Sequence, residues 1–163
     1  MNKAIFLDRD GTINVDYGYV SKVDDLKFIE GVPETLLHLQ NKGYLLIIIT
    51  NQSGVGRGFF TKDDVYRFNE HLSLSLLKKN VKISDFFICF HTPDDLCHCR
   101  KPSTKLLLDA KKKYDIDFSK SFMIGDKESD VIAGRSVGVE SFLIDNSNDF
   151  KSVAKKILEL ENE

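Results

Sequence analysis

The chain has 163 residues, of which 42% are hydrophobic and 29% are charged, and its formal net charge at pH 7 is -2. This composition is typical of a globular protein, and we expect residues 1–163 to form a single domain with a core of ordinary size. The near-neutral charge gives no case for nucleic acid or an anionic membrane as a partner, and no apolar run is long enough to span a bilayer.

Apolar runs of strand length alternate with amphipathic stretches along the chain. The predicted strands are residues 4–7, 44–49, 85–90, 121–124 and 140–144. The predicted helices cover about 33–42, 103–114 and 128–137, with one more after a capping box at Thr61 and Asp64 and a last one around Val153, Ile157 and Leu160. This alternation predicts an α/β fold, a doubly wound, Rossmann-like parallel sheet of about five or six strands.

Polar side chains follow four of the predicted strands, directly in three cases and after the cysteine segment in the fourth. They are Asp8 and Asp10 after the first strand, Thr50 after the second, Lys101 after the third and Asp126 after the fourth. Loops are polar in general, so any one of these residues alone could be ordinary surface. In a doubly wound sheet, however, the carboxyl ends of the strands meet at the ligand-binding edge. The set therefore predicts a site for phosphoryl transfer.

The chemistry of such a site follows from the residue types. Asp8 and Asp10 are two positions apart, so both can lie on one side of an extended chain while Arg9 points away. Neighbouring carboxylates repel unless a cation neutralises them, and oxygen ligands suit Mg²⁺. One carboxylate can attack phosphorus and the other can transfer protons. Thr50 and Lys101 can stabilise the phosphoryl oxygens.

Four separated motifs carry a family resemblance. "DRDGT", "TNQSG", "RKP" and "GDKESD", in this order, resemble the signatures of the haloacid dehalogenase superfamily. Within it the chain is most similar to the D-glycero-D-manno-heptose 1,7-bisphosphate phosphatases, and next to the histidinol-phosphate phosphatases. The resemblance implies that Asp8 is the nucleophile and Asp10 the general acid and base. It also implies that Asp8, Asp126 and the backbone carbonyl of Asp10 hold Mg²⁺, with Thr50 and Lys101 at the phosphoryl group.

All three cysteines lie in one short segment together with two histidines. Two pairs with one intervening residue could supply the four ligands of a structural Zn²⁺ site, namely Cys89, His91, Cys97 and Cys99. The alternatives are three reduced cysteines without a metal, or His98 in place of His91. Both phosphatase types named above carry such a zinc loop before R-K-P. We expect the zinc-stabilised loop to position Arg100 and Lys101.

The sequence has no insertion long enough for a large cap domain, so we expect an open site whose short loops select the substrate. Arg57 and Arg100 are candidates for the phosphate that is not transferred, although Arg57 could also be a solvated loop charge. The expected substrate-binding residues are Asp16, Tyr19, Thr50, Asn51, Gln52, Ser53, Arg57, Arg100, Lys101 and Lys127.

The leading hypothesis is an Mg²⁺-dependent phosphatase that removes the 7-phosphate of the heptose bisphosphate through an aspartyl-phosphate and leaves heptose 1-phosphate. In the family this step serves nucleotide-activated heptose for lipopolysaccharide or surface glycans. One alternative is a histidinol-phosphate phosphatase of histidine biosynthesis. Another is a zinc-stabilised sugar-phosphate binder without activity, against which the Asp8–Asp10 pair argues. We expect a cytoplasmic monomer with a phosphorylated sugar as its partner, because no signal peptide and no exposed apolar stripe is evident.

Overall fold

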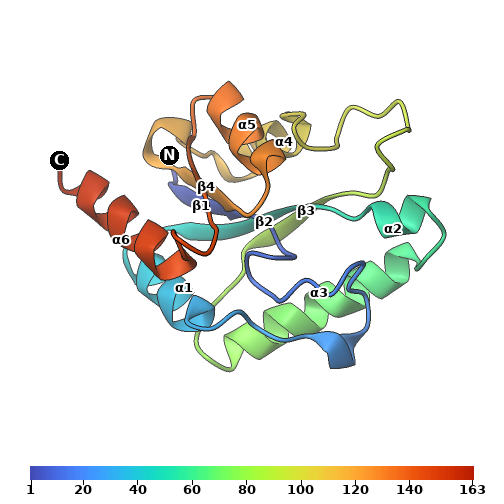
Figure 1. Cartoon of the computed structure of the whole chain (residues 1–163). Coiled ribbons are helices and arrows are strands. Elements are labelled where there is room, and N and C mark those ends of the chain that lie inside the picture. Colours follow the sequence, from blue (N-terminus) through green and yellow to red (C-terminus); the bar gives the residue numbers. More distant parts are fainter.

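A computed structural model describes residues 1–163, and a parallel sheet runs through its centre (Figure 1). The sheet has five strands in the order β3-β2-β1-β4-β5. Every neighbouring pair is parallel, and the strands are β1 (Ala4–Leu7), β2 (Leu45–Asn51), β3 (Asp85–Cys89), β4 (Phe122–Gly125) and β5 (Glu140–Leu143). The prediction of a doubly wound α/β sheet is therefore confirmed.

Helices cover both faces of this sheet (Figure 1). They are α1 (Val32–Asn41), the short α2 (Ser53–Gly56), α3 (Lys62–Leu77), α4 (Lys105–Tyr114), α5 (Glu128–Ser136) and α6 (Phe150–Glu161). Helix α3 begins with the predicted capping box, in which Thr61 and Asp64 each accept a hydrogen bond from the backbone N–H of the other. None of the helices has both the length and the apolar character that crossing a membrane requires.

The core lies in two layers, one on each face of the sheet. Ile5 and Leu7 pack into the larger cluster with residues of α1, α3 and α6, whereas Ala4 and Phe6 pack into the smaller cluster with residues of α4. Because successive side chains of a strand point to opposite faces, a strand covered on both faces must be apolar throughout. All of β1 is buried for this reason, and the strand ends where the first carboxylate begins.

The path of the chain through the sheet determines where the site lies. From β1 the chain moves outward to β2 and β3, and then returns to the other side of β1 to form β4 and β5. The order reverses between β1 and β4, which is the position where doubly wound sheets bind ligands. Residues 8–31 and 90–104 form the long connections near this edge, and neither contains a helix beyond the 3-10 turn Val23–Asp25. There is accordingly no large cap domain.

Candidate active site

Three carboxylates meet at the switch point between β1 and β4. Asp8 continues β1, and its backbone N–H donates to the carbonyl of Ile124 over 3.1 Å. Asp126 follows β4, and Asp130 reaches back from the first turn of α5. One oxygen from each carboxylate lies within 4.8 Å of the others, and Asp8 and Asp130 are buried. The structure thus brings together the predicted Asp8 and Asp126 and adds a third carboxylate.

Lys101 is the cation of this buried cluster. Its Nζ donates to Asp8 Oδ1 over 2.9 Å, to Asp130 Oδ1 over 2.5 Å and to the carbonyl of Ile49 over 2.7 Å. The loop end that carries Lys101 is held by Asn51, which exchanges two hydrogen bonds with its backbone. Burial opposes ionisation of Asp8, but the ammonium of Lys101 holds the pKa of that carboxyl below its usual value. Lys101 is therefore fixed against the expected nucleophile.

Asp130 was not among the predicted site residues, although it closes the motif "GDKESD". Its second oxygen accepts the backbone N–H of Lys127 over 3.1 Å, so the carboxylate both caps the start of α5 and binds Lys101. Burial and the nearby Asp8 raise its pKa. The spacing of four residues between Asp126 and Asp130 is visible in the sequence. It indicates that Asp130 caps a helix and also faces the site only once the first residue of α5 is known.

The carboxylate cluster fits a divalent cation. Burial and the adjacent Asp8 raise the pKa of Asp126 to about 7, and the nearby ammonium of Lys127 offsets this only in part. A set of oxygen donors with excess negative charge is the environment that Mg²⁺ prefers. Gly11 makes room for this arrangement, since a Cβ there would lie 2.1 Å from Asp126 Oδ2 and the residue has φ +83.

Asp10 lies in a different environment from Asp8. Its Oδ1 accepts from Arg9 Nε and from Asn14 Nδ2, both over 3.0 Å, and its Oδ2 accepts from Arg9 Nη2 and from Gln52 Nε2, both over 3.1 Å. Gln52 Nε2 also donates to Thr50 Oγ1 over 2.9 Å. Arg9 had been expected to point away from the two aspartates, but its guanidinium binds one of them. Arg9 and Asn14 are thus site residues that sequence reasoning missed.

A polar pocket of about 300 Å³ opens above Asp10. It contains eight of the ten expected substrate-binding residues, whereas Thr50 and Lys101 are buried beneath it. Arg57, Arg100 and Lys127 give the pocket three cations. Its lining residues are Asp10, Asp16, Gly18, Tyr19, Asn51, Gln52, Ser53, Gly54, Arg57, Arg100 and Lys127.

An aromatic pair lies at Tyr19, which lines the pocket. The rings of Tyr19 and Phe59 meet edge to face with their centroids 4.8 Å apart, and both side chains are exposed. The guanidinium of Arg57 lies 6.0 Å from the centroid of the Tyr19 ring. A larger cavity of about 490 Å³ lies between α1 and α6 and contains none of the carboxylates that follow the strands. The contact with Asp10 therefore favours the smaller pocket as the substrate site.

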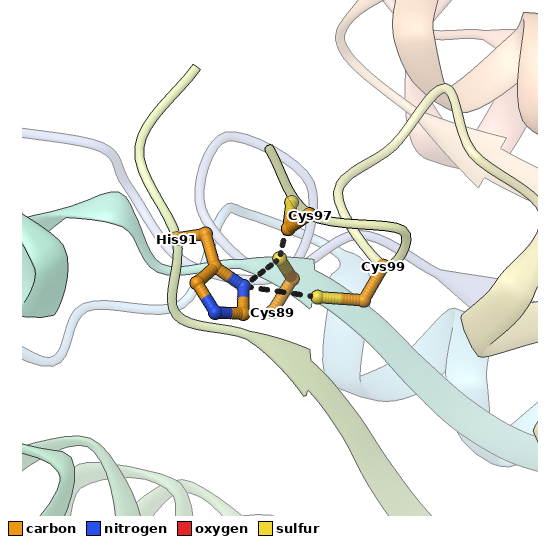
Figure 2. Close-up of side chains that lie close together, drawn as sticks. All are labelled: Cys89, His91, Cys97 and Cys99. Carbon is orange, nitrogen blue, oxygen red and sulfur yellow. Dashed lines mark hydrogen bonds between the residues drawn. The ribbon is translucent and has the colours of Figure 1, made fainter. Parts of the chain in front are cut away.

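The predicted metal-binding residues of the cysteine segment converge in space (Figure 2). Cys89 Sγ lies 3.9 Å from Cys97 Sγ and 3.5 Å from His91 Nδ1, which in turn lies 3.3 Å from Cys99 Sγ. A tetrahedral Zn²⁺ site has edges of about 3.8 Å between sulfurs and about 3.6 Å between nitrogen and sulfur. Three sulfurs and one imidazole nitrogen at these spacings fit Zn²⁺, and the fourth ligand leaves no open position for a substrate.

Replacing Lys101 by methionine tests the buried cation. Lys101→Met removes the ammonium and leaves Asp8 and Asp130 buried without it, so we expect a loss of about 3–5 kcal/mol in the free energy of unfolding, measured by urea denaturation without added Mg²⁺ and without chelator. Turnover is expected to fall at least about 100-fold, because the phosphoryl oxygens lose a positive charge. Lys105→Met, which removes an exposed ion pair with Asp109, is the matched control and should change stability by under about 1 kcal/mol. Equal losses in both variants would contradict this role.

The doubly wound sheet without a large cap, together with carboxylates at the ends of β1 and β4, defines a phosphatase of the haloacid dehalogenase superfamily. A family model described as polynucleotide kinase 3 phosphatase matches residues 3–159. The chain belongs to this family, in the group of the D-glycero-D-manno-heptose-1,7-bisphosphate 7-phosphatases.

Relatives and solved structures support this membership. A D-glycero-beta-D-manno-heptose-1,7-bisphosphate 7-phosphatase of Helicobacter pylori is 46% identical over 93% of this chain and 87% of its own length. The protein of the same name from Haemophilus influenzae is 45% identical over 82% of this chain and 76% of its own length. The crystal structure of the D,D-heptose 1,7-bisphosphate phosphatase from B. bronchiseptica, complexed with magnesium and phosphate, has a TM-score of 0.87 at 26% identity, covering 97% of this chain and 99% of that one.

Proposed function

We propose that this protein hydrolyses the 7-phosphate of D-glycero-D-manno-heptose 1,7-bisphosphate and releases heptose 1-phosphate and inorganic phosphate. The observation that carries the proposal is the pocket above Asp10, which places the expected general acid beside Arg57, Arg100 and Lys127. A bisphosphate needs positive charge for the phosphate that stays as well as for the one that is transferred. The 46% identity to a phosphatase of this name supports the choice of substrate.

In the proposed reaction Asp8 is the nucleophile and Asp10 transfers the protons. The carboxylate of Asp8 attacks phosphorus, and the bond to the sugar oxygen breaks as Asp10 donates a proton to that oxygen. Asp10 then removes a proton from a water that attacks the aspartyl-phosphate, which releases phosphate and restores Asp8. Lys101 and Thr50 stabilise the phosphoryl oxygens; the ammonium of Lys101 already lies 2.9 Å from Asp8 Oδ1.

Two metals complete the proposed enzyme. Mg²⁺, held by Asp8, Asp126 and the backbone carbonyl of Asp10, would neutralise these carboxylates and the charge on the phosphoryl group. Zn²⁺, held by Cys89, His91, Cys97 and Cys99, would be structural. The presence of magnesium in the similar crystal structure supports the first assignment, and the tetrahedral spacing of the four ligand atoms supports the second.

We further propose that residues 1–163 act as one phosphatase domain, as a cytoplasmic monomer without a nucleic-acid or membrane partner. The near-neutral net charge of -2 supports the absence of a nucleic-acid partner. The sugar phosphate is then the molecule that the surface loops recognise, in part through Asp16, Tyr19 and Ser53, which all line the pocket.

A phosphate-release screen tests the substrate. Purified protein with Mg²⁺ is given both anomers of the heptose bisphosphate and histidinol phosphate at equal concentrations, and kcat/KM is measured for each. We expect kcat/KM to be at least about 100-fold higher for one heptose anomer than for histidinol phosphate, because histidinol phosphate leaves a cationic subsite without a phosphate. A preference for histidinol phosphate would contradict the proposal, and no turnover of any ester would favour a binding protein.

A further inference from the structure

Arg9 is the largest fully buried side chain of the protein. Its exposed fraction is 0%, and its guanidinium carbon lies 4.4 Å from the centroid of the Phe68 ring in α3. Burying a charged group is costly unless it is paired and its donors are hydrogen-bonded. An apolar residue at this position would fill the same space without that cost, so the guanidinium requires a reason other than packing.

The guanidinium of Arg9 donates hydrogen bonds to three groups: the side chain of Asn69, the carbonyl of Val20 and the carboxylate of Asp10. Its Nη1 donates to Asn69 Oδ1 of α3 over 2.9 Å, and its Nη2 donates to the carbonyl of Val20 over 2.8 Å. The remaining contacts go to Asp10, from Nε to Oδ1 over 3.0 Å and from Nη2 to Oδ2 over 3.1 Å. This two-point contact fixes the plane of the Asp10 carboxylate as well as its position.

We propose that Arg9 is the positioning residue for Asp10, an inference that rests on the proposed function. Arg9 is fully buried and does not line the pocket, so it acts through Asp10 and not on the substrate. Asn69 of α3 and the carbonyl of Val20, next to Tyr19 in the loop, hold the guanidinium, and the guanidinium holds the carboxylate toward the leaving oxygen. A lysine has the same charge but lacks the planar fork, so it cannot reproduce this contact.

The role predicts a dependence on the leaving group. A sugar alkoxide needs a proton from Asp10 as its bond to phosphorus breaks, whereas p-nitrophenolate leaves with the electron pair and needs none. The second step is the same for both esters, because water must lose a proton to Asp10 as it displaces Asp8 from phosphorus. If Asp10 is misplaced, the first step with p-nitrophenyl phosphate should keep its rate. The first step with the sugar ester and the second step with either ester should slow.

The experiment compares Arg9→Lys with the wild type and with Arg67→Lys, an exposed arginine on α3 paired with Asp64. On the sugar bisphosphate we expect kcat of Arg9→Lys to fall roughly 10–100-fold, with KM within about threefold of wild type. On p-nitrophenyl phosphate we expect a rapid burst of p-nitrophenol followed by a slow phase. In an Asp10→Asn background, Arg9→Lys should cause no additional loss of kcat. Arg67→Lys should match the wild type.

Three results would overturn the inference: full activity of Arg9→Lys, equal slowing of the burst and the slow phase, or a further loss in the Asp10→Asn background. Circular dichroism reports whether each variant is folded. If Arg9→Lys unfolds below the assay temperature, Asn69→Ala, which removes one bond to the guanidinium without touching Asp10, is subjected to the same measurements and the same criteria. An inactive wild type would overturn the proposed function as well, whereas an active one without these patterns overturns only the positioning role.

Discussion

Asp8→Asn is expected to abolish turnover, with kcat reduced by on the order of 10⁴-fold or more. An amide cannot attack phosphorus as a carboxylate does, so no aspartyl-phosphate forms. The fold should persist, because Lys101 keeps its bonds to Asp130 and to the carbonyl of Ile49. Loss of one charge also relieves the repulsion that raises the pKa of Asp126. Phosphate release measures the loss of turnover, and the melting temperature of the same preparation measures whether the fold persists.

The control for Asp8→Asn is Asp63→Asn. Asp63 is exposed in the first turn of α3, so the same chemical change there should leave turnover intact and alter stability by under about 1 kcal/mol. Retained turnover in Asp8→Asn would show that another group attacks phosphorus. Lost turnover accompanied by unfolding would instead show that the buried ion pair with Lys101 is needed for the fold.

Removal of zinc is expected to cost stability first and activity second. Residues 90–104 contain no helix or strand, and Leu96 is fully exposed, so this loop has no apolar core of its own. If metal binding stabilises the protein by about 3–4 kcal/mol, a chelator or Cys97→Ser should lower the melting temperature by about 10 °C. Activity falls afterwards, as the loop end that carries Lys101 loses its order.

His98→Gln is the matched control for Cys97→Ser. His98 lies between two predicted ligands, is exposed and does not belong to the Cys/His cluster, so its substitution should retain about one zinc ion per chain and the wild-type melting temperature. Zinc content is measured by atomic emission on protein purified without chelator. Activity lost at an unchanged melting temperature would contradict the structural role, as would wild-type protein that contains no zinc.

The strands could be predicted from the sequence because they are local patterns. Apolar runs covered on both faces are hard to mistake, and each of the five predicted strands overlaps a real one. Strand β2 extends to Asn51, beyond the predicted end at 49, because Thr50 and Asn51 pair with Ile88 and Cys89 of β3. Polar residues at the end of a strand are held in the sheet by hydrogen bonds to a partner strand. Because β3 is distant in sequence, the local pattern around Thr50 and Asn51 does not predict this pairing.

The candidate site was predictable where neighbours in sequence are neighbours in space. The Cys/His segment falls in this group. The pocket residues come from segments as far apart as Asp16, Ser53 and Lys127, and only the motifs along the chain predicted them together. Arg9 and Asn14 were missed because their significance depends on a carboxylate that turns toward them, which side-chain alternation does not reveal. The alternation rule places Arg9 opposite Asp10, yet an arginine side chain is long enough to reach around its own backbone.

Strand β3 lies at the edge of the sheet and pairs only with β2. Asp8 and Asp10 follow β1 and Asp126 follows β4 in the middle of the sheet, while the loop that carries Arg100 leaves from the edge. A change in the length of that loop ahead of Arg100 therefore disturbs no strand pairing, as long as Lys101 keeps its contacts with Asp8 and Asp130. Substrate preference in such a phosphatase can diverge at the periphery of the sheet while its central chemistry stays the same.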